Sequence, residues 1–351
     1  MSLPTDTPLS RSWIKINPPV FFTSAALTIV FLVFTIAAPE TAAAWFGAAQ
    51  KWILDSAGWF YVLAVAFFLV FVIYLGVSEF GRIKLGPDHS EPDYSYASWF
   101  AMLFSAGMGI GLMFFGVLEP VYHMAISEPL GVPSPFAEDG SIIEANVAAA
   151  REMGLAATIF HWGLHPWAIY AVVALALAFF SFNRGLPLTL RSAFYPVLGE
   201  RVWGWWGHAV DTVAVLATLF GLATSLGFGA QQANAGLNYV FGAPIGAGVQ
   251  VLLIAGITAV ALISVLRGLD GGVKVLSEIN MVVAALLLVF VLLAGPTITI
   301  IQDFFGGLLA YGKDLIPLSN PIGREDDGYR QGWTSFYWAW WISWSPFVGM
   351  F

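Results

Sequence analysis

The stretch AGMGIGLMFFG (Ala106–Gly116) places four glycines within an otherwise apolar segment that runs from residue 99 to residue 122. Each glycine in a helix interior costs roughly 1 kcal/mol relative to alanine, so four of them need an explanation. One explanation is close packing against a neighbouring helix, which small residues permit. The other is a break in the helix, whose unwound backbone offers carbonyl and amide groups to a ligand. Gly107, Gly109 and Gly111 spread over more than half of the helix circumference, which favours the break only if other features of a ligand site are present.

The composition of the whole chain defines its class. Of its 351 residues, 58% are hydrophobic and 10% are charged, whereas soluble domains carry about 25% charged residues. We therefore predict an all-α polytopic membrane protein. The chain has no cysteine, which excludes disulfides and thiolate metal sites. Its formal net charge of −8 argues against a nucleic-acid partner.

Apolar runs of about 20 residues, long enough to cross a bilayer, recur along the chain. The first is longer than the core of a signal peptide, which predicts a retained membrane span. Residues 297–318 mix apolar and polar side chains, which predicts an interfacial helix along the membrane surface. The predicted spans are 18–38, 58–79, 98–124, 153–182, 208–238, 244–266 and 275–296, and an eighth begins near residue 333 and reaches the end of the chain.

The distribution of lysine and arginine predicts the orientation of these spans. With the N-terminus inside, nine basic residues lie on the inner side and five on the outer side, as the positive-inside rule requires. We therefore expect a multi-pass protein of the plasma (inner) membrane with a cytoplasmic N-terminus. The inner set is Arg11, Lys15, Arg82, Lys84, Arg184, Arg191, Arg201, Arg267 and Lys274, and the outer set is Lys51, Arg151, Lys313, Arg324 and Arg330.

Aromatic residues gather at the start of the fourth span. The stretch FHWGLHPWAIY covers residues 160–170. Its Trp162, Trp167 and Tyr170 fall on one side of a helix. Several aromatic faces around a cavity attract a cation, and quaternary ammonium is the usual guest. These residues are the second feature of a ligand site.

The eighth span is richer still in tryptophan. The stretch WTSFYWAWWISWSPF covers residues 333–347 and holds five tryptophans. For Trp333, at its outer end, the aromatic belt of the membrane interface is the simpler interpretation. For Trp340, Trp341 and Trp344, one to two turns deeper, we expect contact with a ligand.

Ionisable residues at membrane depth are functional candidates by default. His161 and His165 are four residues apart, which suits a metal or haem, but no third ligand has a matching spacing. We therefore interpret them as hydrogen-bonded structural histidines near the outer surface. Glu119 is assigned a capping or network role, and Asp211 a structural role at a helix N-terminus. His123 is the fifth residue of this group, and the five include no cluster of acid, base and nucleophile that would indicate an enzyme.

Three motifs together resemble those of the betaine/choline/carnitine transporter (BCCT) family. They are GMGIGLMFFGVLEPVYH (107–123), HWGLHPWAIY (161–170) and SFYWAWWISWSPFVGMF (335–351), and GLDGGVKVLSEINM (268–281) is similar to the family's link between its sixth and seventh spans. The resemblance covers residues from about 10 to the end. It implies an inverted five-helix-repeat transporter fold with two extra N-terminal helices, assembled as a homotrimer among membrane lipids.

On this resemblance the chain is one transmembrane domain, 1–351, that ends within the eighth of twelve spans, with the second repeat largely missing. We therefore expect residues 1–351 alone not to transport. The predicted parts are a cytoplasmic N-terminus (1–17), two peripheral helices (18–97), the first five-helix repeat (98–296), an interfacial helix and outer loop (297–331) and the start of the second repeat (332–351).

The resemblance also implies a substrate site. The trimethylammonium group would lie in a cage of aromatic rings, lined further along by two more indoles, against the unwound glycine stretch. The cage residues are Trp162, Trp167, Tyr170 and Trp341, the further indoles are Trp340 and Trp344, and the unwound stretch is Met108, Gly109, Ile110 and Gly111.

Sodium is the implied coupling ion, and no other cofactor is expected. One ion would use backbone carbonyls near Ser105, Ala106 and Met108, and a second would lie near Thr218 and Phe347. The second site is weakened by Leu222, where some relatives carry a threonine, and the remaining ligands of the first site belong to a tenth span.

The implied function is import of a quaternary-ammonium or sulfonium osmolyte, with glycine betaine foremost. Gly111 favours sodium coupling, because proton-coupled choline members of the family carry aspartate at that position. Proton-coupled choline uptake, sodium-independent carnitine-type antiport, and uptake of ectoine or dimethylsulfoniopropionate remain alternatives. A gated channel is a different class, but a broken helix beside an aromatic cage favours binding during alternating access. A membrane sensor would need a larger cytosolic domain than the visible inner loops provide.

Overall fold

The computed structural model describes residues 16–107, 109–320, 322 and 327–350. This part of the chain is helical and holds no strand, apart from an isolated bridge between Phe136 and Ile142. Six of its helical segments are long and apolar enough to cross a membrane. The chain is therefore an all-α polytopic membrane protein, as predicted.

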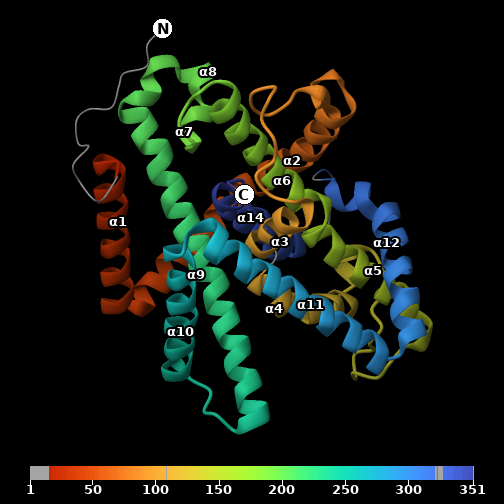
Figure 1. Cartoon of the computed structure of the whole chain (residues 1–351). Coiled ribbons are helices and arrows are strands. Elements are labelled where there is room, and N and C mark those ends of the chain that lie inside the picture. Colours follow the sequence, from red (N-terminus) through yellow and green to blue (C-terminus); the bar gives the residue numbers. More distant parts are fainter. Residues whose placement is uncertain (1–15, 108, 321, 323–326, 351) are drawn as a thin grey trace.

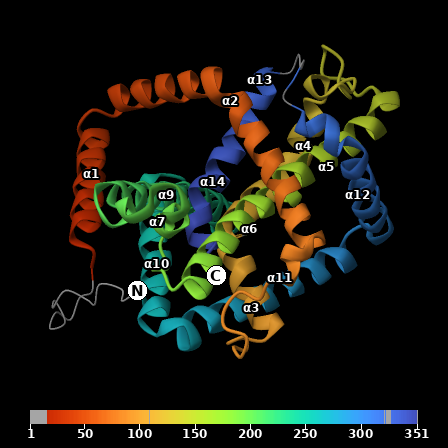
Figure 2. The same cartoon turned by 90° about the horizontal axis from the view of Figure 1, so that it is seen from above.

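Two proline-initiated helices open the chain. Helix α1 (Pro18–Ala37) and helix α2 (Pro39–Val77) both begin at proline, which suits the first helical position because it has no N–H to leave unpaired. Helix α2 starts well before the predicted span 58–79, since the alanine-rich segment that follows Pro39 has a high helix propensity. Figures 1 and 2 both show α1 at one edge of the molecule and α12 (Thr297–Ser319) at the opposite edge, with α6 and α14 between them.

The predicted third span is broken, as the glycines suggested. It forms α3 (Tyr96–Gly107) and α4 (Ile110–Ala125). Neither half is long enough to cross a membrane alone, so the structure has six membrane-length segments where the sequence predicted seven complete spans.

A second break divides the predicted fourth span and was not expected from the sequence. Helix α5 (Glu144–Trp162) ends and α6 (Leu164–Ala178) begins on either side of Gly163. A Cβ atom on Gly163 would lie 2.5 Å from the carbonyl oxygen of Ile159. Gly163 has φ −92° and ψ −128°, and only a residue without a Cβ adopts this conformation without pressing on that oxygen.

Helices α14 and α12 pack against the broken helices. Helix α14 contacts α2, α3, α6 and α9, and α12 lies along α5. The remaining helices and turns are α7 (Leu190–Ala193), α8 (Tyr195–Leu198), α9 (Trp205–Phe241), α10 (Ala247–Leu266), α11 (Lys274–Ala294), α13 (Asp327–Tyr329) and α14 (Phe336–Val348), with 3-10 turns at Glu79–Arg82, Glu128–Leu130 and Gly199–Trp203 and π-helical turns at Phe179–Asn183, Leu269–Val273 and Arg330–Ser335.

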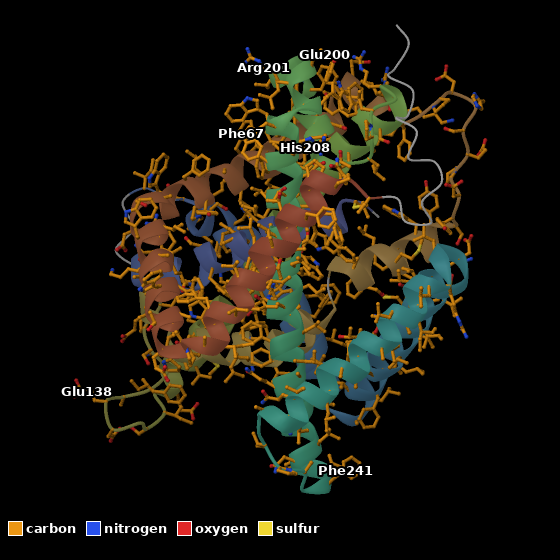
Figure 3. The ribbon with its side chains drawn as sticks, turned by 90° about the vertical axis from the view of Figure 1, so that its left-hand side faces the viewer. Phe67, Glu138, Glu200, Arg201, His208 and Phe241 are labelled. Carbon is orange, nitrogen blue, oxygen red and sulfur yellow. The ribbon has the colours of Figure 1, made fainter. Side chains whose placement is uncertain are left out.

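Helix α12 is the predicted interfacial helix, and it packs closely on α5. A Cβ on Gly307 would lie 3.2 Å from Leu155, and Arg151 forms an ion pair with Asp303 at 3.1 Å. Its placement on the membrane surface stays a prediction. In Figure 3, Glu200 and Arg201 lie at one end of the molecule and Phe241 at the other, as expected for segments joined by the long helix α9.

Asp211 is held by an arginine rather than by a helix N-terminus. Helix α9 begins at Trp205, so Asp211 is already in its second turn. Its carboxylate accepts hydrogen bonds from Arg191, at 2.6 Å from Nε and 3.0 Å from the backbone nitrogen. Asp211 therefore has the predicted structural role, but the helix dipole is the wrong explanation for it. The buried pair ties the short helix α7 to α9.

Candidate functional site

The four predicted cage residues lie together. Trp162, at the end of α5, and Trp341, on α14, have ring centroids 4.8 Å apart and planes at 73°. Tyr170 on α6 lies 6.3 Å from Trp341, and Trp167 lies 5.7 Å from Tyr170. On the two sides of the break at Gly163, one ring from α5 and one from α6 thus lie against α14, and Trp167 lies next to Tyr170.

The two further indoles extend this cluster. Trp340 stacks on Trp341 with centroids 4.8 Å apart and planes at 9°. The indole N–H of Trp344 donates to the backbone oxygen of Ala106 at 2.7 Å. The indole N–H of Trp341 donates to the backbone oxygen of His161 at 3.0 Å. Helix α14 is therefore fastened to both broken helices through its tryptophans.

The glycines of the third span serve both explanations at once. A Cβ on Gly107 would lie 3.4 Å from Tyr170, and one on Gly111 would lie 3.0 Å from Trp162 and 3.1 Å from Trp340. Gly107 and Gly111 thus make room for aromatic rings, while the helix is interrupted between them.

Gly109, also predicted to belong to the unwound stretch, lies directly before the first residue of α4. A Cβ on Gly109 would meet only the backbone oxygen of Ser105, at 3.3 Å. Met108 lies outside the described residues, as does the side chain of Ile110.

The predicted sodium ligands lie in two places. The hydroxyl of Ser105 accepts a hydrogen bond from Asn280 at 3.2 Å, and the carbonyl of Ala106 accepts the Trp344 indole.

The second predicted sodium site lies where α9 packs on α14. Thr218 precedes Gly221 by one turn, and a Cβ on Gly221 would lie 3.0 Å from Trp344. The ring of Phe347 packs on Trp344 at 5.2 Å. Both sodium sites stay predictions.

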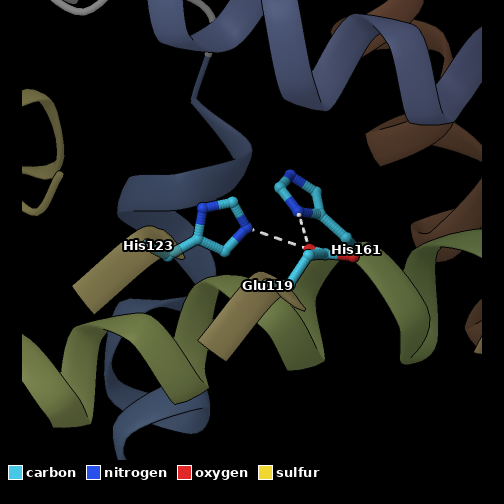
Figure 4. A group of neighbouring side chains, drawn as sticks. All are labelled: Glu119, His123 and His161. Carbon is cyan, nitrogen blue, oxygen red and sulfur yellow. Dashed lines mark hydrogen bonds and ion pairs between the residues drawn. The ribbon is translucent and has the colours of Figure 1, made fainter. Parts of the chain in front are cut away.

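Behind the cage, Glu119 forms a buried hydrogen-bond network (Figure 4). Its Oε2 atom accepts from Nε2 of His123 at 2.9 Å and from Nδ1 of His161 at 3.0 Å. Its Oε1 atom accepts from the indole N–H of Trp162 and from the hydroxyl of Tyr337. The network role predicted for Glu119 is present, and it includes a cage residue.

His161 and His165 are both hydrogen-bonded, as predicted. The sequence-based statement that no third ligand is available is wrong, because His123 and Glu119 form a group with His161 whose three ligand atoms lie within 4.8 Å of one another. A metal ion fits that spacing, but Glu119 and both rings already have hydrogen-bond partners within the protein. The ring of Trp333 lies 4.7 Å from that of His123, at the edge of the network, and its assignment to the interfacial belt stays a prediction.

Helix α12 adds residues that the sequence reasoning missed. The hydroxyl of Tyr311 accepts a hydrogen bond from the backbone N–H of Leu164 at 3.4 Å, directly after the break. Ser319 lies 3.0 Å from Nε2 of His165, and the His165 ring stacks on Trp338. No spacing within residues 297–319 indicates these long-range contacts.

Broken helices that meet at a buried cluster of aromatic rings define a class of helical membrane proteins that bind small molecules at depth. The chain belongs to the BCCT (betaine/carnitine/choline) family of transporters, whose sequence pattern matches residues 19–351. The matched family and the relatives found are transporters, not enzymes.

Three relatives illustrate the similarity. The chain is 51% identical over 343 residues to a glycine betaine/proline/choline transporter of Vibrio parahaemolyticus, covering 96% of this chain and 62% of that protein. It is 44% identical over 335 residues to the glycine betaine transporter OpuD of Bacillus subtilis, covering 95% and 63%. It is 42% identical over 354 residues to the high-affinity choline transport protein of Escherichia coli, covering 99% and 50%. The chain thus spans between half and two thirds of the length of these relatives.

Proposed function

We propose that this chain carries the substrate site of a secondary transporter that imports a quaternary-ammonium osmolyte by alternating access. The observation that carries the proposal is the group of four aromatic rings from α5, α6 and α14 at two helix breaks. Aromatic faces hold a methylated ammonium through the ring quadrupole without needing an N–H donor on the ligand. Broken helices at membrane depth supply the polar backbone groups that transporters use for substrate and ions.

Glycine betaine is the substrate we propose first. The Vibrio and Bacillus relatives carry it in their names, at 51% and 44% identity. Choline is the second candidate, since it appears in the names of the Vibrio and Escherichia relatives. Both molecules present the same trimethylammonium group to the cage.

We propose sodium as the coupling ion. Gly111 supports this, because the Cβ of any other residue at that position would lie 3.0 Å from Trp162 and 3.1 Å from Trp340. These distances are about the closest that a packed interior allows. A proton-carrying carboxylate there would need both indoles to move. A homotrimer in the plasma membrane with a cytoplasmic N-terminus completes the proposal.

Uptake into proteoliposomes tests this function. The full-length gene product should accumulate glycine betaine saturably, and replacing external sodium with potassium should abolish accumulation. Uptake that ignores sodium but follows a pH gradient would refute sodium coupling. Exchange of one substrate for another without either gradient would point to antiport.

A further inference from the structure

Glu119 lies behind the cage and not on its surface. It is fully buried on α4, and it binds the indole N–H of Trp162, one of the four cage rings. The other donors to its carboxylate are His123, His161 and Tyr337. The carboxylate therefore joins α4, α5 and α14 at the point where the cage is assembled.

The partners of the two histidines suit neutral rings. Nδ1 of His123 lies 3.1 Å from the hydroxyl of Tyr329, and Nε2 of His161 lies 3.1 Å from the hydroxyl of Thr334. A neutral imidazole donates from one nitrogen and accepts at the other. Neutral rings thus donate to Glu119 and accept hydroxyl protons, so each ring nitrogen has a suitable partner.

With this arrangement Glu119 receives four donors, and an ionised carboxylate has about four acceptor positions. The indole of Trp162 can only donate, so the Oε1 atom that it binds must accept. Within the described residues, the ion-pair partners of Glu119 are the two histidines. With both histidines neutral, the group carries one negative charge in a buried place.

We propose that Glu119 is a positioning residue that gives the cage a negative charge through Trp162. Hydrogen bonds to an ionised acceptor are stronger than neutral ones, and the bond from the indole N–H holds the Trp162 ring against Trp341, 4.8 Å away. The same charge increases the electron density of the ring and so its attraction for a cation. No carboxylate needs to touch the substrate. This inference rests on the proposed function.

The charge has a consequence that packing alone does not produce. Choline carries a net charge of +1, whereas glycine betaine carries a carboxylate that cancels the charge of its head. Both present the same trimethylammonium group to the rings. A buried negative charge behind Trp162 therefore favours choline over betaine, and its removal should change the ratio of their affinities.

Calorimetric titration of the purified full-length gene product tests this with choline and glycine betaine as probes. Glu119→Gln keeps the shape of the side chain and removes its charge. We expect it to raise the Kd of choline about tenfold more than the Kd of betaine. This factor comes from a Coulomb interaction across one indole at an effective dielectric constant near 20. Glu119→Asp keeps the charge on a shorter side chain and should leave the ratio of the two Kd values unchanged. Equal weakening of both ligands by Glu119→Gln would mean a purely structural role and would overturn the proposal.

Two further variants keep the test valid if Glu119→Gln does not fold. Trp162→Phe keeps a ring and the charge of Glu119 but has no N–H for that carboxylate, so it should weaken both ligands and keep the wild-type ratio. Tyr337→Phe removes the other donor to the same oxygen and leaves the bond to Trp162, so it should keep the wild-type ratio. If Trp162→Phe shifts the ratio about tenfold, the hydrogen bond and not the charge sets it, and the proposal is wrong. If the wild-type protein binds neither probe, the proposed function itself fails, which is a different result from an unchanged ratio.

Discussion

Replacing Trp341 is the sharpest test of the cage. Its indole is 3% exposed and has ring centroids 4.8 Å from both Trp162 and Trp340. A desolvated cation–π contact is worth up to about 2 kcal/mol, and about 1.4 kcal/mol is a factor of ten in affinity. We therefore expect Trp341→Leu, which keeps apolar bulk and removes the quadrupole, to raise the Kd of glycine betaine by about ten- to thirtyfold.

Trp341→Phe should lose less affinity, because a smaller aromatic face remains. It also loses the hydrogen bond to the backbone oxygen of His161, a buried acceptor, so we expect about 1–3 kcal/mol less stability. Affinity must therefore be measured by calorimetry on protein that thermal unfolding shows to be folded.

The control is Trp205→Leu, at a tryptophan that is 73% exposed at the start of α9. A ligand analogue with a neutral tert-butyl head has the shape of trimethylammonium without its charge and should bind far more weakly. If Trp341→Leu binds like the parent, or if the neutral analogue binds equally well, the aromatic cluster is packing and not a cation site.

Three other perturbations follow from the structure. Gly111→Ala should displace two indoles, which should cost about 1–3 kcal/mol in stability and about tenfold in affinity. The control Gly236→Ala on α9, where a Cβ meets open space, should stabilise the protein by about 0.5–1 kcal/mol. Thermal unfolding measures the stability of each variant, and calorimetry measures its affinity. Asp211→Ala leaves Arg191 buried without its partner and should destabilise by about 3–5 kcal/mol, with an unchanged Kd for glycine betaine; a large change in that Kd would mean that the pair acts on the site. Glycine betaine should bind more tightly in sodium chloride than in potassium chloride, and equal Kd values in the two salts would contradict sodium coupling.

Much of the fold was predictable because it depends on patterns within single segments. Apolar length identified the spans, and the glycines at positions 107 to 111 predicted the break between α3 and α4. The early start of α2 and the break at Gly163 were missed. Helix α2 starts early because of the helix propensity of alanine in a segment less apolar than a span. The break depends on the conformation of one glycine, which a single glycine in the sequence does not reveal.

Aromatic stretches near a ligand site were predictable because tryptophan is rare and its spacing is informative, whereas the choice of Trp162, Trp167, Tyr170 and Trp341 came from the family resemblance, and their role as a cage stays a prediction. The network behind these rings was not predictable, since Glu119, His123 and His161 meet only when α4 and α5 pack together. The contact of Trp333 with the ring of His123 was not predictable for the same reason.

Counterflow of labelled glycine betaine tests the central claim most directly. Proteoliposomes that contain the full-length gene product are loaded with unlabelled glycine betaine, and entry of the labelled form is followed with sodium on both sides. The account predicts saturable entry that excess choline inhibits and that Trp162→Leu reduces by about ten- to thirtyfold at low substrate concentration. Entry that does not saturate, or that Trp162→Leu leaves unchanged, would contradict transport through this aromatic site.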